Sequence, residues 1–162
     1  MKSTILEKTK LVNSVFSKVY EKYDLMNDIM SLGIHRLWKS KFIDWMNPIQ
    51  NSKLIDVASG TGDIARLFSQ RVKNTGQITC IEPNDKMFKT GKENLKNLKN
   101  IYWIKGNAEL LPIKDNTYDF YSISYGIRNV TDINKTLKEA YRVLKPGGRF
   151  MCLEFSKIDN EI

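Results

Sequence analysis

From residue 53 onward, short apolar runs alternate with segments of helical periodicity, and this alternation restricts the fold more than any other feature. Helical spacing of apolar residues predicts helices over 63–72, 85–98 and 134–144. The apolar runs predict strands over 53–57, 77–81, 101–104, 118–124 and 149–155. Short apolar strands that alternate with helices are typical of a parallel sheet covered by helices on both faces. The sequence therefore predicts an α/β fold.

The first 50 residues have a different pattern. Apolar side chains between residues 11 and 20 recur at helical spacing, and a second helix is expected near 37–46, before Pro48. A chain of 162 residues has the usual length of one domain. We therefore expect a single domain over 1–162, with a helical lid region over 1–50 and a ligand-binding core over 51–162.

Composition excludes several classes of protein. No apolar run approaches the roughly 20 residues of a membrane span, and residues 1–4 do not open a signal peptide. We therefore expect a cytoplasmic protein. The net charge is +8, but the lysines between residues 86 and 99 are scattered as on a solvent-facing helix, which favours a solvated surface over a nucleic-acid site. Cys80 and Cys152 lie in apolar runs and are expected in the core, and with only His35 beside them no metal site is predicted.

Glycines directly follow the first predicted strand. In the segment 56–62, Gly60 and Gly62 stand between the strand and the next helix, where the backbone can turn sharply and free N–H groups can meet a ligand. Glu82 ends the second strand about 20 residues later, where an acid can accept hydrogen bonds from both hydroxyls of a ribose. Ligands of such sheets bind beyond the carboxyl ends of the strands, where both features are expected.

This glycine pattern alone leaves three alternatives. It fits a nicotinamide or flavin site, an S-adenosylmethionine site, and a plain structural turn. Asp56 favours the second, because a carboxylate is unfavourable inside an apolar strand unless it holds the loop or the amino group of a ligand. Asn107 and its neighbour Ala108, after the third strand, suit the edge of an adenine; the alternative for them is an ordinary turn.

Two longer motifs give a specific resemblance. The segment 56–148 resembles the class I S-adenosylmethionine-dependent methyltransferases. Within that class, residues 23–38 and 142–156 resemble two motifs of the ubiquinone/menaquinone biosynthesis C-methyltransferases, and residues 125–132 also resemble that family. The resemblance extends over about residues 15–157 and implies the Rossmann-like fold of that class. Members of the family continue past the second motif, so the resemblance implies a sheet without its last strands. Either the chain is a fragment, or a second copy or a partner chain covers the open edge of the sheet.

The resemblance also implies site residues. The cofactor, S-adenosyl-L-methionine, would be contacted by Asp56, Gly60, Thr61, Gly62, Glu82, Asn107, Ala108 and Ser124. This chain has Ser59 where the family usually has glycine, and Glu82 where it more often has aspartate. A serine fits if its backbone is not left-handed, and a glutamate can make the same two ribose bonds.

The implied reaction is methylation of a ring carbon of a polyprenyl quinol. Arg128 and Asn129, just beyond the fourth strand, are the candidate catalytic residues, and a loop-fixing ion pair is the alternative role of Arg128. His35 and Trp38 could shape a lid, although packing is the simpler role for Trp38. A polyprenyl substrate implies transient contact with the inner membrane surface. A catalytically impaired cofactor-binding fragment and, less favoured, an NAD-dependent oxidoreductase remain alternatives.

Overall fold

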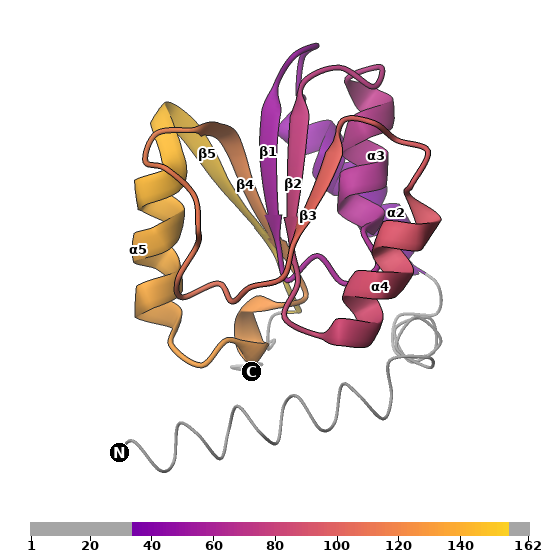
Figure 1. Cartoon of the computed structure of the whole chain (residues 1–162). Helices are drawn as coiled ribbons and strands as arrows, with labels where there is room; N and C mark the ends of the chain where they lie inside the picture. Colours follow the sequence, from indigo (N-terminus) through magenta and orange to yellow (C-terminus); the bar gives the residue numbers. More distant parts are fainter. Residues whose placement is uncertain (1–33, 156–162) are drawn as a thin grey trace, which may run out of the picture.

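The computed structural model describes residues 34–155, and the predicted helix over 11–20 and most of the first motif lie outside them. A parallel sheet with strand order β3-β2-β1-β4-β5 forms the centre of the molecule (Figure 1). The strands are β1 (Lys53–Val57), β2 (Gln77–Ile81), β3 (Ile101–Ile104), β4 (Tyr118–Ser124) and β5 (Leu144–Leu153). The α/β prediction is confirmed, and the first four strands have the predicted bounds.

The fifth strand begins earlier than predicted. Leu144 already pairs with Tyr118, and regular pairing resumes where Arg149 meets Phe120, with a register shift between the two pairs. The turn-forming segment 145–148 is therefore a bulge within β5, because the chain enters the sheet directly from the preceding helix.

Helices cover both sides of the sheet. In Figure 1, α2, α3 and α4 lie on one side and α5 on the other. Their bounds are α2 (Ile34–Met46), α3 (Asp63–Arg71), α4 (Asp85–Asn94) and α5 (Ile133–Val143), with a short 3₁₀ helix η1 (Ile127–Asn129) before α5. Two starts are fixed by capping: Asn84 accepts hydrogen bonds from the first turn of α4, and Asp132 from that of α5. Helix α4 ends at Asn94 rather than residue 98, because the chain turns toward β3 after Leu95.

Each face of the sheet has its own apolar core. On one face, Phe42, Ile43 and Met46 of α2 join buried residues of α3 and the strands. On the other face, Ala140 and Val143 of α5 pack in a cluster of buried residues from β1 and β4. Helix α2 is thus part of the core, while its role as part of a lid stays a prediction. No helix within residues 34–155 is long and apolar enough to cross a membrane.

The edge strands of the described sheet are β3 and β5. Cys80, on an inner strand, is buried as predicted, but the prediction for Cys152 is wrong: it is exposed. An apolar run on an edge strand has no neighbour on its outer side, and periodicity alone does not distinguish an edge strand from an inner one.

Gly91 provides a test of the packing between α4 and β3. A Cβ atom at this position would overlap the indole ring of Trp103. A Gly→Ala change inside an unobstructed helix stabilises by about 0.5–1 kcal/mol, whereas overpacking costs about 1–3 kcal/mol. We expect Gly91→Ala to lower the free energy of unfolding in urea. The exposed Lys89→Ala on the same helix is the control and should stay within about 0.5 kcal/mol of the parent; stabilisation by Gly91→Ala would contradict the packing.

Candidate cofactor-binding and active site

The predicted site residues meet at the carboxyl ends of the strands. The glycine loop follows β1, Glu82 follows β2, Asn107 follows β3, and Arg128 follows β4. The carboxyl ends of these strands lie at the lower end of Figure 1. The chain continues from β1 to its neighbour β2 but reaches its other neighbour, β4, only later, so the strand order reverses beside β1. A crevice at such a reversal is where α/β sheets bind their ligands. The roles of the individual residues stay predictions.

The glycine loop turns through several positive φ angles and is tightly packed at Gly62. Gly60 and Gly62 have φ angles of 58° and 88°, and Ala58 also has a positive φ of 53°. A Cβ atom on Gly62 would lie 2.6 Å from Cδ1 of Leu95 and 3.0 Å from Cζ2 of Trp103. Glycine at position 62 therefore serves both conformation and packing. Ser59 is not among the residues with positive φ, so its backbone accommodates the serine in place of the family's usual glycine.

Glu82 holds this loop in place. One oxygen, Oε2, accepts a hydrogen bond from the N–H of Gly60 at 2.7 Å, and Oε1 accepts one from the N–H of Asn84 at 2.8 Å. The side chain is buried, and burial raises the pKa of its carboxyl group. Each carboxylate oxygen has a second lone pair, so Glu82 can still accept hydrogen bonds from ligand hydroxyls. The sequence predicted the acid at this place but not its bond to the glycine loop.

Asp56 lies on β1, shortly before the glycine loop, and one of its carboxylate oxygens is unused among the described residues. Its Oδ1 accepts a hydrogen bond of 2.6 Å from the Ser122 hydroxyl, while the buried Oδ2 has no hydrogen-bond partner within residues 34–155. Burial raises the pKa of this carboxyl group to about 7, against the opposing effects of Ser122 and Lys39. A buried carboxylate oxygen without a partner is unfavourable alone, so the arrangement suits a ligand with a cationic amino group.

Lys39 is a site residue that sequence analysis missed. Its Nζ lies 2.7 Å from Oδ2 of Asp63, the first residue of α3 directly after the glycine loop, and its side chain is only 11% exposed. Burial by itself would raise the pKa of Asp63, but Lys39 and other nearby cations lower it. The ion pair joins α2 to the glycine loop across 24 positions, and no motif or spacing pointed to it.

The third and fourth strands contribute smaller polar groups. Asn107 is exposed and forms an isolated antiparallel bridge with Leu110, whereas Ala108 is buried. Ser124, at the end of β4, has a buried hydroxyl oxygen without a hydrogen-bond partner among the described residues. A buried hydroxyl in this state is consistent with the predicted ligand contact at Ser124.

Arg128 and Asn129 lie on η1, just past β4. The Arg128 Nη1 atom is 3.2 Å from Oε1 of Glu154, and its guanidinium lies 5.5 Å from the ring centre of Phe155. Asn129 donates weakly from Nδ2 to the carbonyl oxygen of Tyr125 at 3.5 Å. The sequence analysis gives an ion pair as the alternative role of Arg128. It does not identify Glu154, a residue of the second motif, as the partner.

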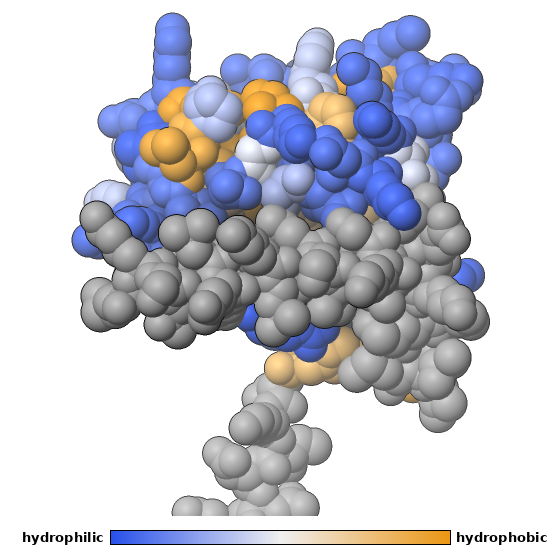
Figure 2. All heavy atoms as spheres, turned by 60° about the horizontal axis from the view of Figure 1, so that its bottom comes forward, coloured by the Kyte–Doolittle hydropathy of each residue, from blue (hydrophilic) through white to orange (hydrophobic). Residues whose placement is uncertain are grey.

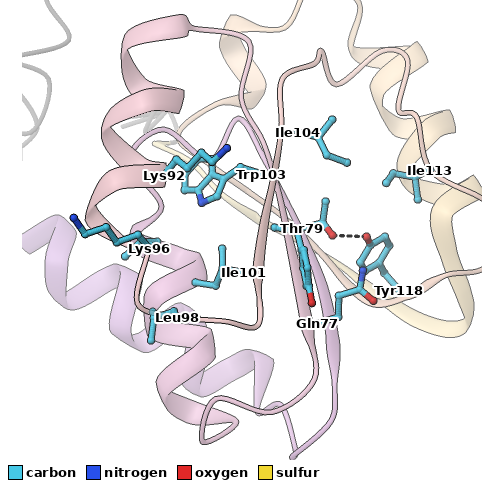
Figure 3. Close-up of a pocket in the computed structure, with 12 residues that line it drawn as sticks. Gln77, Thr79, Lys92, Lys96, Leu98, Ile101, Trp103, Ile104, Ile113 and Tyr118 are labelled. Carbon is cyan, nitrogen blue, oxygen red and sulfur yellow. Dashed lines mark hydrogen bonds between the residues drawn. The ribbon is translucent and has the colours of Figure 1, made fainter.

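The cavity in Figure 3 is a separate feature. It has a volume of about 650 Å³ and lies between β2, β3, α4 and the start of β4, where Tyr118 donates a 2.6 Å hydrogen bond to Thr79. Trp103 and Ile101 supply apolar lining, with Lys92 and Lys96 beside them. None of the predicted cofactor or catalytic residues lines this cavity, so it is not the candidate site.

Figure 2 turns the carboxyl ends of the strands toward the viewer. The visible coloured surface is largely hydrophilic, with apolar residues gathered toward the side on which Figure 1 shows α5. Among residues 34–155, the exposed apolar side chains include Leu110, which is 80% exposed, and Ile133, which is 48% exposed. Among residues 34–155, no group of three or more His, Cys, Asp or Glu side chains could hold a metal ion.

Solved structures share the architecture. A SAM-dependent methyltransferase from Aquifex aeolicus matches with a TM-score of 0.69 and 23% identity, over 76% of this chain and 67% of that one. A putative S-adenosyl-L-methionine-dependent methyltransferase from Methanococcus maripaludis gives 0.69 at 21% identity, over 82% and 62%. The fold is thus the Rossmann-like fold of class I methyltransferases.

Sequence comparison goes further. The model of the ubiE/COQ5 methyltransferase family matches residues 3–162, and the chain belongs to that family. The ubiquinone/menaquinone biosynthesis C-methyltransferase UbiE of Rickettsia bellii is 51% identical over 96% of this chain. The mitochondrial 2-methoxy-6-polyprenyl-1,4-benzoquinol methylase of Dictyostelium discoideum is 43% identical, also over 96%. The chain spans 65% of the first relative's length and 60% of the second's.

Proposed function

We propose that this chain binds S-adenosylmethionine at the glycine loop. The observation that carries the proposal is the buried Glu82 carboxylate, which fixes the Gly60 N–H at 2.7 Å where the strand order reverses. The unused Oδ2 of Asp56 suits the cofactor's amino group, and the buried hydroxyl of Ser124 offers a further polar contact. Thr61, Gly62, Asn107 and Ala108 complete the proposed binding residues.

The proposed reaction is C-methylation of a polyprenyl quinol, either a demethylmenaquinol or a 2-polyprenyl-6-methoxy-1,4-benzoquinol. The names of the relatives from Rickettsia bellii and Dictyostelium discoideum support this substrate class. Bound S-adenosylmethionine supplies an electrophilic methyl group on a sulfonium. The protein's task is to hold the quinol ring carbon in line with that methyl group and to help the phenolic proton leave.

Arg128 and Asn129 are the residues we propose next to the quinol. The guanidinium of Arg128 is a cation, so its role is to lower the pKa of a neighbouring phenol by its charge. Asn129 lies on the same turn, where its side-chain amide can hydrogen-bond a quinol oxygen. The Arg128–Glu154 ion pair of 3.2 Å keeps the guanidinium at the carboxyl ends of β4 and β5.

Calorimetric titration tests the cofactor proposal. We expect saturable binding of S-adenosylmethionine and none of NAD, because NAD carries no cationic amino group to pair with Asp56. Binding of NAD alone would support an oxidoreductase and contradict the proposal. Binding of S-adenosylmethionine without turnover of a short-chain demethylquinol would leave a cofactor-binding module as the function.

We further propose transient contact of a cytoplasmic protein with the inner membrane surface, which a polyprenyl substrate requires. The net charge of +8 and the exposed Leu110 and Ile133 support this contact. We expect sedimentation with phosphatidylglycerol vesicles, weakened but not abolished at physiological salt. Complete loss of binding at that salt concentration would overturn the proposal.

A second copy or a partner chain against β5 is also proposed. Phe150 on this edge strand is 38% exposed and Cys152 is exposed, as expected for a strand that pairs with a further element. Sedimentation equilibrium of the purified chain tests the second copy, and a monomer at all concentrations would leave only the partner chain.

A further inference from the structure

The proposed reaction needs a group that accepts the phenolic proton, and Arg128 does not provide one. We infer that Glu154 is this proton acceptor, an assignment that rests on the proposed quinol methylation. Glu154 follows β5 directly, where it faces Arg128 of η1. A general base must present an available lone pair at the site, and the contacts of Glu154 meet this requirement.

The two carboxylate oxygens of Glu154 have different surroundings. Oε1 lies 3.2 Å from Nη1 of Arg128 and accepts a 2.9 Å hydrogen bond from the N–H of Phe155. Oε2 is buried and has no hydrogen-bond partner within residues 34–155. One oxygen therefore fixes the orientation of the carboxylate while the other is left for a donor from outside the described chain, such as a phenol.

Phe155, the residue after Glu154, belongs to a cluster of aromatic rings. The Phe155 ring stacks on Tyr125 with 4.8 Å between centroids, and it packs in a T-shaped arrangement with the Trp38 ring of α2 at a centroid distance of 5.7 Å. Arg128 lies over the same Phe155 ring. An aromatic cluster next to the carboxylate in the chain suits an aromatic substrate.

Glu154 is also close to the proposed cofactor contacts. Leu153, its neighbour, pairs with Ser124 across β4 and β5, and the carbonyl oxygen of Leu153 accepts a 2.7 Å hydrogen bond from the N–H of Tyr125. Ser124 is one of the residues proposed to bind the cofactor. The carboxylate is thus held at the same end of the sheet as the methyl donor's proposed site.

The other carboxylates at this end already have structural partners. Glu82 accepts backbone hydrogen bonds on both oxygens, and Oε1 of Glu109 accepts those from the N–H groups of Thr131 and Asp132. Oδ1 of Asp56 accepts a hydrogen bond from Ser122, and its other oxygen is the one proposed for the cofactor's amino group. Among residues 34–155, Glu154 is the carboxylate that combines a fixed oxygen, an unused one and a contact with the catalytic candidate Arg128.

Oε2 of Glu154 takes the phenolic proton, and the O–H electron pair moves into the ring as the ortho carbon bonds the methyl carbon. The sulfur–methyl bond breaks with its electrons on sulfur. Loss of the hydrogen from the methylated ring carbon and return of a proton to oxygen restore the quinol, so that one proton in total is released to water.

A binding experiment tests whether the phenolic hydroxyl meets Glu154. The probes are 2-prenyl-1-naphthol and its methyl ether, titrated in the presence of S-adenosylhomocysteine and followed by naphthol fluorescence. A hydrogen bond to a charged group corresponds to roughly a 10–100-fold difference in affinity. We expect the parent to prefer the naphthol by about this factor and Glu154→Gln to bind both probes equally within about threefold.

Three variants make the result specific. Glu93→Gln removes one charge from an exposed position on α4 and should keep the parent's preference. Glu154→Asp keeps a carboxylate and should retain part of the preference, which guards against a folding defect in Glu154→Gln. In turnover of a short-chain demethylquinol, Glu154→Gln should lower kcat about 100-fold and also raise KM, because the hydrogen bond to the quinol hydroxyl is lost.

The outcomes separate this inference from the proposed function. Equal binding of both probes by the parent, or a full preference in Glu154→Gln, overturns the role of Glu154 alone. A parent that binds S-adenosylhomocysteine but neither probe contradicts the quinol substrate itself, and the role of Glu154 with it.

Discussion

Replacing Glu82 by alanine should lower the affinity for S-adenosylmethionine by roughly 30–1000-fold. The carboxylate has a double function, because it would bind the ribose hydroxyls and it holds the Gly60 N–H at 2.7 Å. Its loss leaves the buried N–H groups of Gly60 and Asn84 without an acceptor. Truncation of a buried, hydrogen-bonded charge costs about 2–4 kcal/mol, which gives the expected range. Calorimetric titration of the folded variant is the measurement.

Two further variants serve as controls for the Glu82→Ala result. Glu82→Asp keeps the carboxylate that the family more often uses and should lose no more than about tenfold in affinity, because only one methylene of reach is removed. Glu93→Ala on the surface of α4 is the matched control and should bind like the parent. Parent-like affinity in Glu82→Ala would show that the cofactor site lies elsewhere.

Much of the fold could be predicted because its signals are local. The apolar runs of β1 and β2 are bounded by turn-forming residues, and both strands have the predicted limits. Errors arose where the outcome depended on distant contacts. Helix α4 ends early as Leu95 packs near the glycine loop, and Cys152 is exposed because β5 is an edge strand. Neither contact has a signature in nearby sequence.

In the candidate site, too, features with a local signal could be predicted and features that depend on distant contacts could not. The motif predicted that Gly60, Gly62 and Glu82 lie near one another, because they follow neighbouring parallel strands. It did not predict Lys39, whose buried ion pair with Asp63 depends on how α2 packs against α3. The role inferred for Glu154 could not be predicted either. It depends on the different surroundings of the two carboxylate oxygens, and these exist only in the folded chain.

Asp56→Asn should remove a pH dependence of folding stability. Burial raises the carboxyl pKa from 3.8 to about 7, so the native state holds this proton more tightly than the unfolded chain. Stability from this group therefore falls as pH rises from about 4 to about 7 and is constant above, by up to about 4 kcal/mol. Urea unfolding of parent and variant between pH 4 and 8 measures the difference; equal pH dependence would contradict a buried, poorly paired carboxylate.

The same carboxylate should make cofactor binding depend on pH in the opposite sense. A cationic amino group requires ionised Asp56, so affinity for S-adenosylmethionine should rise up to about tenfold per pH unit below the Asp56 pKa of about 7. It should fall again above about pH 8, where an α-amino group loses its own proton. Asp56→Asn keeps an oxygen acceptor but no charge, so its affinity should be weaker at pH 7.5 and nearly flat from pH 5.5 to 7. A parent-like rise in the variant would assign the titration to another group, since Lys39, Glu82 and Asp63 also interact electrostatically with Asp56.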